Sequence, residues 1–184
     1  MQVLHAAKKY QLPSLVKSCI TFLESQLHMS SACTILDHSL FFEEPRLTQK
    51  SLREIEAFTE HALSSEDFNS LSRDAVSMIL DSDKLTISEL DLFEKTYEWA
   101  VCNCKEPETI RETLGECLYK IRFPIIPVKE FTEIVCPKNI LSSDEQLEIS
   151  KYIAALTNGA KPSRFNCTPR TGPPVTRKGI VVST

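Results

Sequence analysis

The chain has 184 residues, of which 42% are hydrophobic and 25% charged, and its formal net charge is −4. This length suits one domain with a sizeable core, or one domain and part of another, and the composition is ordinary for a soluble globular protein. Five basic residues and no acidic one fall in residues 160–184, which leaves 16 basic against 25 acidic residues, a net charge of −9, for residues 1–159. An acidic body of this kind argues against nucleic acid as the main partner.

The seven cysteines are irregularly spaced, and the opening MQVLHAAKKY acquires charge too soon for a secretory signal. An odd number of cysteines without a regular framework favours free thiols in a reducing compartment. We therefore expect a cytoplasmic protein, with the nucleus as an additional location. No apolar stretch approaches the roughly 20 residues that a membrane-spanning helix needs.

Residues 1–157 carry apolar side chains at steps of three and four, the spacing that predicts helices. Pro13 suits the first position of one helix, Ser30 or Ser31 can cap the next, and Pro45 starts another. Alternating strand patterns are absent from this part of the sequence. The expected fold is all-α, built of antiparallel helix pairs.

The stretch LFEKTYEWAVCNC, residues 92–104, raises the question of a metal or redox site, because Cys102 and Cys104 lie close together beside Trp99. Thr86 and Glu89 have the spacing of a capping box, which predicts a helix from this point. At about 100° per residue the two cysteines point about 200° apart, so one ion cannot be bound by both. We expect a packed helix instead, with Trp99 and Cys104 in the core.

The segment RFPIIP, residues 122–127, predicts a break, because each proline disfavours helix in the residue before it. Before this break, Pro107 is expected to open a helix that continues through Leu118. After it, a last helix is expected to begin with a capping box of Ser143 and Gln146 and to stop at Gly159.

Glycine and proline concentrate in residues 159–184. This shift in composition marks a domain end, and we expect residues 158–184 to be a mobile linker, a disordered C-terminal tail. The final GIVVST fits either the first strand of a further domain or a stray apolar end.

Recognisable catalytic motifs are missing. Neither glycine-rich phosphate-binding motif occurs, the chain has only four glycines, and the four histidines lack a metalloprotease spacing. We therefore assign no catalytic, cofactor-binding or metal-binding residue, and expect a binding protein rather than an enzyme.

A run of consecutive apolar residues, Leu40, Phe41 and Phe42, is the most informative binding feature. One helix cannot turn three consecutive side chains onto its own core face. Either another part of the chain covers one of them, which is the simpler alternative, or a protein partner does. We take Leu40, Phe41, Phe42 and the nearby Leu47 as candidate protein-binding residues.

Several stretches together resemble the BTB–BACK family. Residues 3–27 are similar to the last two helices of a BTB domain, and residues 32–63 to the helix pair called the 3-box. Residues 68–100 and 121–131 resemble the BACK domain, whose signature includes the tryptophan and the Arg-Phe-Pro break. The resemblance implies four parts: a truncated BTB domain (1–28), a 3-box (29–63), a BACK domain (64–157) and a linker or tail (158–184).

The resemblance further implies a non-enzymatic substrate adaptor of a cullin-3 RING ubiquitin ligase, in which BTB and 3-box hold cullin-3. The tail KPSRFNCTPR is most similar to the linker of family members that continue into a PHR β-sandwich. The BTB core, which supplies dimerisation and most cullin contacts, and a substrate-binding module are not among these residues. The alternative is a helical interaction scaffold or corepressor platform unrelated to ubiquitin.

Overall fold

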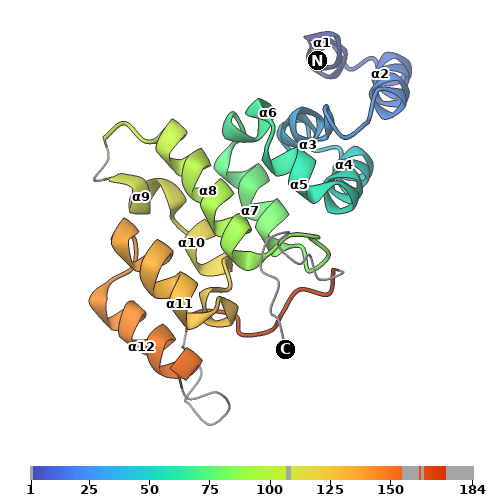
Figure 1. The fold of residues 1–184 in the computed structure, drawn as a ribbon. Coiled ribbons are helices and arrows are strands. Elements are labelled where there is room, and N and C mark those ends of the chain that lie inside the picture. The colour runs from blue at the N-terminus through green and yellow to red at the C-terminus, as the bar shows by residue number, and fades with distance from the viewer. Residues whose placement is uncertain (1, 107–108, 155–161, 163, 173–184) are drawn as a thin grey trace. The chain divides into compact units, whose positions relative to one another are not determined.

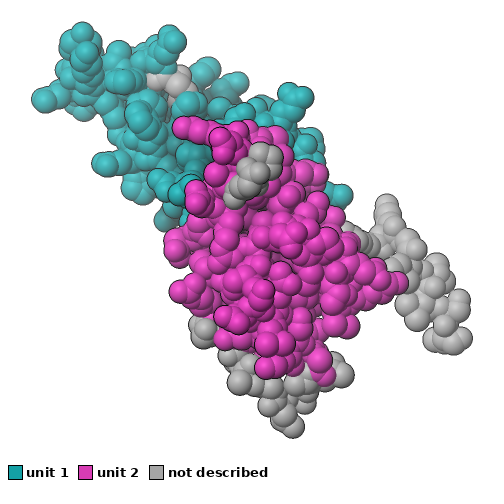
Figure 2. Space-filling view, turned by 90° about the vertical axis from the view of Figure 1, so that its left-hand side faces the viewer, with its two compact units in different colours: residues 1–79 teal, residues 80–184 magenta. Residues whose placement is uncertain are grey.

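The computed structural model describes residues 2–106, 109–154, 162 and 164–172. The chain divides into two compact units, residues 1–79 (unit 1) and 80–184 (unit 2), which Figure 2 distinguishes by colour. Throughout the described residues the regular structure is helical and no strand occurs, so the all-α expectation is confirmed. Within the same residues, every helix is too short or too polar to cross a membrane.

Unit 1 contains, in chain order, α1 (Gln2–Lys9), α2 (Pro13–Ser25), α3 (Ala32–Phe41), α4 (Pro45–Ala57), α5 (Thr59–Leu63), α6 (Glu66–Asn69) and most of α7 (Arg73–Asp81) (Figure 1). Helix α1 packs on α2, α3 on α4, and α2 also contacts α4. Pro13 and Pro45 stand in the first turns of their helices, as predicted. The core of the unit includes the fully buried Leu36, Leu47 and Ile55.

Unit 2 contains α8 (Glu89–Asn103), α9 (Ile110–Leu114), α10 (Cys117–Lys120), the 3-10 turn η2 (Phe123–Ile125), α11 (Val128–Glu130), the π-helical turn η3 (Phe131–Val135), the 3-10 turn η4 (Cys136–Lys138) and α12 (Ser143–Ala154). Helix α8 contacts α9 and η2, while α12 contacts η2 and α11. Trp99 of α8 is only 2% exposed, which confirms the packed-helix prediction.

Two helix starts differ from the expected capping boxes. Ser88, not Thr86, caps α8, and its hydroxyl accepts a hydrogen bond from the Asp91 amide at 3.1 Å. Glu89 is not a capping residue, because it is buried and its carboxylate accepts the backbone N–H of Arg122 at 2.7 Å.

Helix α12 begins with a capping box one residue earlier than predicted. The Ser142 amide donates to Glu145 at 2.7 Å, and the Glu145 amide donates to the Ser142 hydroxyl at 3.2 Å. Ser143 and Gln146 therefore do not form the box. The expected stop at Gly159 lies outside the described residues.

The predicted break at residues 122–127 is confirmed, because η2 gives way there to an extended Ile126. The helix expected from Pro107 through Leu118 is instead divided into α9 and α10 at Gly115. The φ of Gly115 is 51°, in the left-handed region that a glycine adopts without strain. Pro107 itself lies outside the described residues.

Residues 164–172, here called the strap, differ from the mobile linker expected over residues 158–184. Phe165 is 5% exposed, and its ring lies 5.5 Å from that of Tyr119 and 5.6 Å from that of Phe123. These contacts lie within unit 2, so the strap is part of that unit. The rest of the expected tail, apart from residue 162, is outside the described residues.

Candidate functional site

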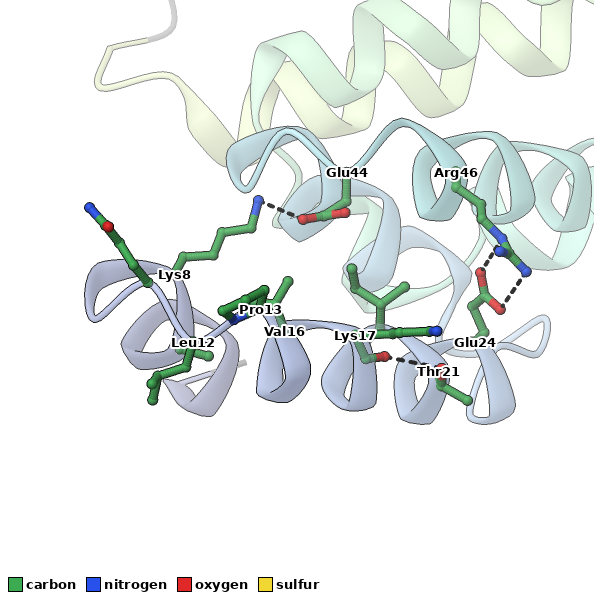
Figure 3. Close-up of a pocket in the computed structure, with 12 residues that line it drawn as sticks. Lys8, Leu12, Pro13, Val16, Lys17, Thr21, Glu24, Glu44 and Arg46 are labelled. Atoms are coloured by element: carbon green, nitrogen blue, oxygen red, sulfur yellow. Dashed lines mark hydrogen bonds and ion pairs between the residues drawn. The ribbon is translucent and has the colours of Figure 1, made fainter.

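A cleft of about 840 Å³ lies within unit 1, between α1, α2 and the beginning of α4 (Figure 3). Its apolar side is formed by five residues of α1, α2 and the turn between them: Ala7, Leu12, Pro13, Val16 and Ile20. Lys17, Thr21 and Glu24 extend the α2 side of the cleft, and Glu44 and Arg46 face them from the start of α4.

Helix α2 presents this side as a consequence of helical periodicity. Val16, Ile20 and Glu24 are spaced four residues apart and therefore share one face of the helix. No residue of α2 is buried, and Val16 and Ile20 are only half-buried. The apolar surface in the cleft is thus available to another molecule, in contrast to the buried faces of α3 and α4.

An ion pair lies at each end of the cleft. At one end Lys8 Nζ lies 2.5 Å from Glu44 Oε1; at the other, Arg46 Nε lies 3.0 Å from Glu24 Oε1 (Figure 3). Lys50 also pairs with Glu24, with 2.7 Å between Nζ and Oε2. The hydrogen bond from Lys50, with a further contribution from Arg46, lowers the pKa of Glu24, so this carboxylate remains ionised.

The arrangement suits an extended peptide. An apolar floor can take an anchoring side chain, and the ion-paired groups at the ends can exchange partners with peptide N–H, C=O or charged groups. The carboxylates of Glu24 and Glu44 are only 14% and 17% exposed, so a peptide that displaces one of their partners must itself supply a donor to that carboxylate.

The four candidate protein-binding residues from the sequence differ from one another in how far they are exposed. Phe41 is 73% exposed, whereas Phe42 is half-buried and its ring meets that of His5 at 5.9 Å. Leu40 is half-buried. Leu47 is completely buried between the helices of unit 1, so we correct its assignment from partner contact to core residue. None of these four residues lines the cleft.

The cleft residues themselves were not identified from the sequence. Val16 and Ile20 lie in a helix with an apolar face, which is the pattern that predicts a helix. The same pattern occurs whether the face is covered or open, so periodicity provides no signal that separates the two.

The cysteines do not assemble a metal site in the part of the chain that the structure describes. No group of three or more His, Cys, Asp or Glu side chains is placed to hold an ion there. Cys102 is exposed, and Cys104 is half-buried rather than in the core, because α8 ends at Asn103 and Cys104 occupies the cap position. All seven cysteines are free thiols.

Comparison with known proteins gives consistent matches. The model of the BACK family (BTB And C-terminal Kelch) matches residues 32–136. The chain is 36% identical to BTB/POZ domain-containing protein 6 of Homo sapiens over 161 residues, covering 84% of this chain and 30% of that protein. It is 34% identical both to protein 6-B of Danio rerio and to BTB/POZ domain-containing protein 3 of Homo sapiens, covering 84% of this chain and 33% and 31% of those proteins. The chain thus spans about a third of the length of these relatives.

Proposed function

Because the chain belongs to the BACK family, we propose that it is the interaction scaffold of a substrate adaptor for a cullin-3 RING ubiquitin ligase. It contributes binding surfaces and spacing, and the ligase assembled on it carries out the ubiquitin transfer. In this proposal the chain itself is not an enzyme, and it works in the cytoplasm, with the nucleus as a second location. The seven free thiols support a reducing compartment.

The cleft of unit 1 is the observation that carries the proposal. It combines an open apolar floor from α2 with charged ends that include Glu44 and Arg46 at the start of α4. We assign this cleft to an extended segment of cullin-3, which would lie beside α3 and α4, the helix pair that resembles a 3-box. Phe41, exposed at the end of α3, offers a second apolar contact on the same helix pair.

A second surface of α2 supports the link to BTB-containing relatives. Leu15 and Phe22 do not line the cleft and are 38% and 62% exposed. Large apolar side chains on a helix with no buried residue are suited to cover by another folded part. In the relatives whose names include a BTB/POZ domain, we propose that the BTB core provides this cover and, with it, dimerisation.

Binding of purified cullin-3 to the 184-residue chain tests the assignment. Val16→Glu and Ile20→Glu each place a charge on the floor of the cleft, on a helix without buried residues. We expect cullin-3 affinity to fall at least about thirtyfold, the effect of losing an anchoring contact worth about 2 kcal/mol. Phe22→Ala is the matched control, because it removes a larger apolar group from α2 outside the cleft.

Circular dichroism of each variant establishes that the helices persist. If the two cleft variants bind cullin-3 as tightly as the Phe22→Ala control does, the cleft assignment fails. If the unaltered chain does not bind cullin-3 at all, these residues lack the contact assigned to the cleft, and a helical scaffold or corepressor platform unrelated to ubiquitin becomes the better explanation of them.

A further inference from the structure

The strap of residues 164–172 lies across unit 2 and is held at both of its ends. Its first part is fixed by Phe165, which packs on Tyr119 and Phe123. In the middle, the Thr168 carbonyl accepts a hydrogen bond from Arg122 Nη1 at 2.7 Å. These contacts join a segment near the end of the chain to the turns around η2.

Arg170 is the central contact. Its side chain and that of Glu89 are 4% and 5% exposed, and Nε and Nη2 of Arg170 donate to the two carboxylate oxygens at 3.0 and 3.2 Å. The remaining N–H groups donate to three backbone carbonyls, those of Leu80, Ser82 and Lys120. All five donors of the guanidinium therefore have acceptors within unit 2.

The last described residues are attached to the turn before α8. The amides of Thr171 and Gly172 both donate to the Asp83 carbonyl, at 2.7 and 3.3 Å. A Cβ added to Gly172 would lie 2.4 Å from the Leu85 carbonyl oxygen, closer than any side-chain carbon is found. The chain therefore passes this turn in direct backbone contact.

We propose that the strap is a peptide docked in cis, with Arg170 as its anchor, which fixes the position of the chain at Gly172 on unit 2. The binding site consists of the buried Glu89 carboxylate, three inward-facing carbonyls and the Tyr119–Phe123 surface. Without Arg170 the charge of Glu89 would remain buried opposite a single backbone N–H, that of Arg122. Release of the strap is therefore opposed by the cost of an uncompensated buried charge.

This arrangement has a consequence for an adaptor, which rests on the function proposed above. A substrate-binding part that follows Gly172 would begin from a fixed position on unit 2 rather than from a free tether. The strap would then determine where a captured protein is presented. The anchor is separate from the cleft of unit 1, so each can be altered without the other.

Hydrogen exchange of single amides in the full chain, followed by NMR, tests the anchor. In Arg170→Ala we expect exchange at Thr171 and Gly172 to accelerate by about a hundred- to a thousandfold, the factor that corresponds to breaking a buried pair. Amides in the middle of α8 should stay protected. Arg164→Ala is the matched control, because Arg164 is an exposed arginine of the same strap whose contacts are confined to Tyr119: its guanidinium lies over the ring, and Nη1 donates to the hydroxyl at 2.9 Å. The amides of Thr171 and Gly172 should exchange in this variant as in the unaltered chain.

Arg170→Lys provides a second variant that keeps a cation opposite Glu89 but cannot reach both carboxylate oxygens and three carbonyls. It should preserve α8 while still accelerating exchange at Thr171 and Gly172. Unchanged protection of these two amides in both variants would overturn the proposal. So would an equal loss of protection in α8 and the strap of Arg170→Lys, because Arg170 would then stabilise the whole unit instead of anchoring a separable segment. Cullin-3 binding should be unchanged in all three variants, so this test and the cleft test fail independently.

Discussion

Arg111 and Glu145 form a two-point salt bridge within unit 2, with Nη1 and Nη2 at 2.9 and 3.0 Å from the two carboxylate oxygens. The Tyr119 hydroxyl donates to the same carboxylate at 3.2 Å. Arg111 also donates to the Ile140 carbonyl, so it joins α9 to the segment that enters α12. The hydrogen bonds from Arg111 are the main cause that lowers the pKa of Glu145 to about 2, from an ordinary value of 4.5.

This pair predicts an acid dependence of stability. A carboxyl group whose pKa is lowered by folding stabilises the folded state fully above its unfolded pKa, and this contribution is lost as the pH falls towards the folded value. We expect Glu145→Gln to lower the free energy of unfolding by about 2 kcal/mol at neutral pH, allowing for the partly exposed Arg111. Chemical denaturation of both proteins should show the difference shrinking from about pH 5 to about pH 2. A constant difference across this range would contradict the lowered pKa.

Trp99 is predicted to be a stability residue without a binding role. Because its side chain is almost fully buried, Trp99→Ala should lower the free energy of unfolding by about 3–5 kcal/mol. Val101, which is 45% exposed on the same helix, is the control, and Val101→Ala should change stability by less than about 0.5 kcal/mol. Thermal denaturation of both variants measures the contrast; equal losses would mean that α8 is oriented differently.

Alanine substitutions of Phe41 and Leu47 should have opposite effects, the first on cullin-3 binding and the second on stability. Phe41→Ala removes a ring that is 73% exposed, so we expect stability to change by less than about 0.5 kcal/mol and cullin-3 binding to weaken. Leu47→Ala opens a cavity in the fully buried interior and should cost about 2–5 kcal/mol. Denaturation and cullin-3 affinity are measured on the same samples. A Phe41→Ala variant that unfolds several degrees lower would instead make Phe41 a structural residue.

The cysteines are predicted to differ widely in reactivity. Burial is the main cause that raises the pKa of Cys33 to about 11, so its reactive thiolate is scarce at neutral pH. Cys102 is exposed and should be alkylated first by iodoacetamide. Mass spectrometry after brief labelling of the native protein checks the order, and labelling in denaturant shows that Cys33 reacts once unfolded. Early modification of Cys33 in the native protein would contradict its burial.

Local features of the chain were predictable from the sequence where one residue type decides the geometry. Pro13 and Pro45 begin helices because a proline fits the first turn, and this requires no knowledge of the rest of the fold. The cap of α8 was misplaced for the opposite reason. Thr86 and Ser88 are each followed three residues later by a carboxylate, so either could cap the helix. Which of them does so depends on Glu89, whose carboxylate is bound by an arginine 81 positions along the chain.

The site was less predictable than the fold. Helical spacing shows that Val16 and Ile20 share a face, but not whether another part of the chain covers that face. The docking of the strap is not predictable for a related reason. Proline and glycine indicate only an irregular backbone. Docking depends on two contacts, the packing of Phe165 on Tyr119 and the ion pair of Arg170 with Glu89. Such contacts between distant residues leave no periodic trace in the sequence.

The close passage of Gly172 beside Leu85 also provides a diagnostic for other members of the family. Only a residue without a side chain fits at 2.4 Å from that carbonyl oxygen. A homologue that keeps an arginine two positions before a glycine here should carry the same docked segment, whereas one with a larger residue should route its chain differently. The residue type at this one position would then indicate whether the segment is docked.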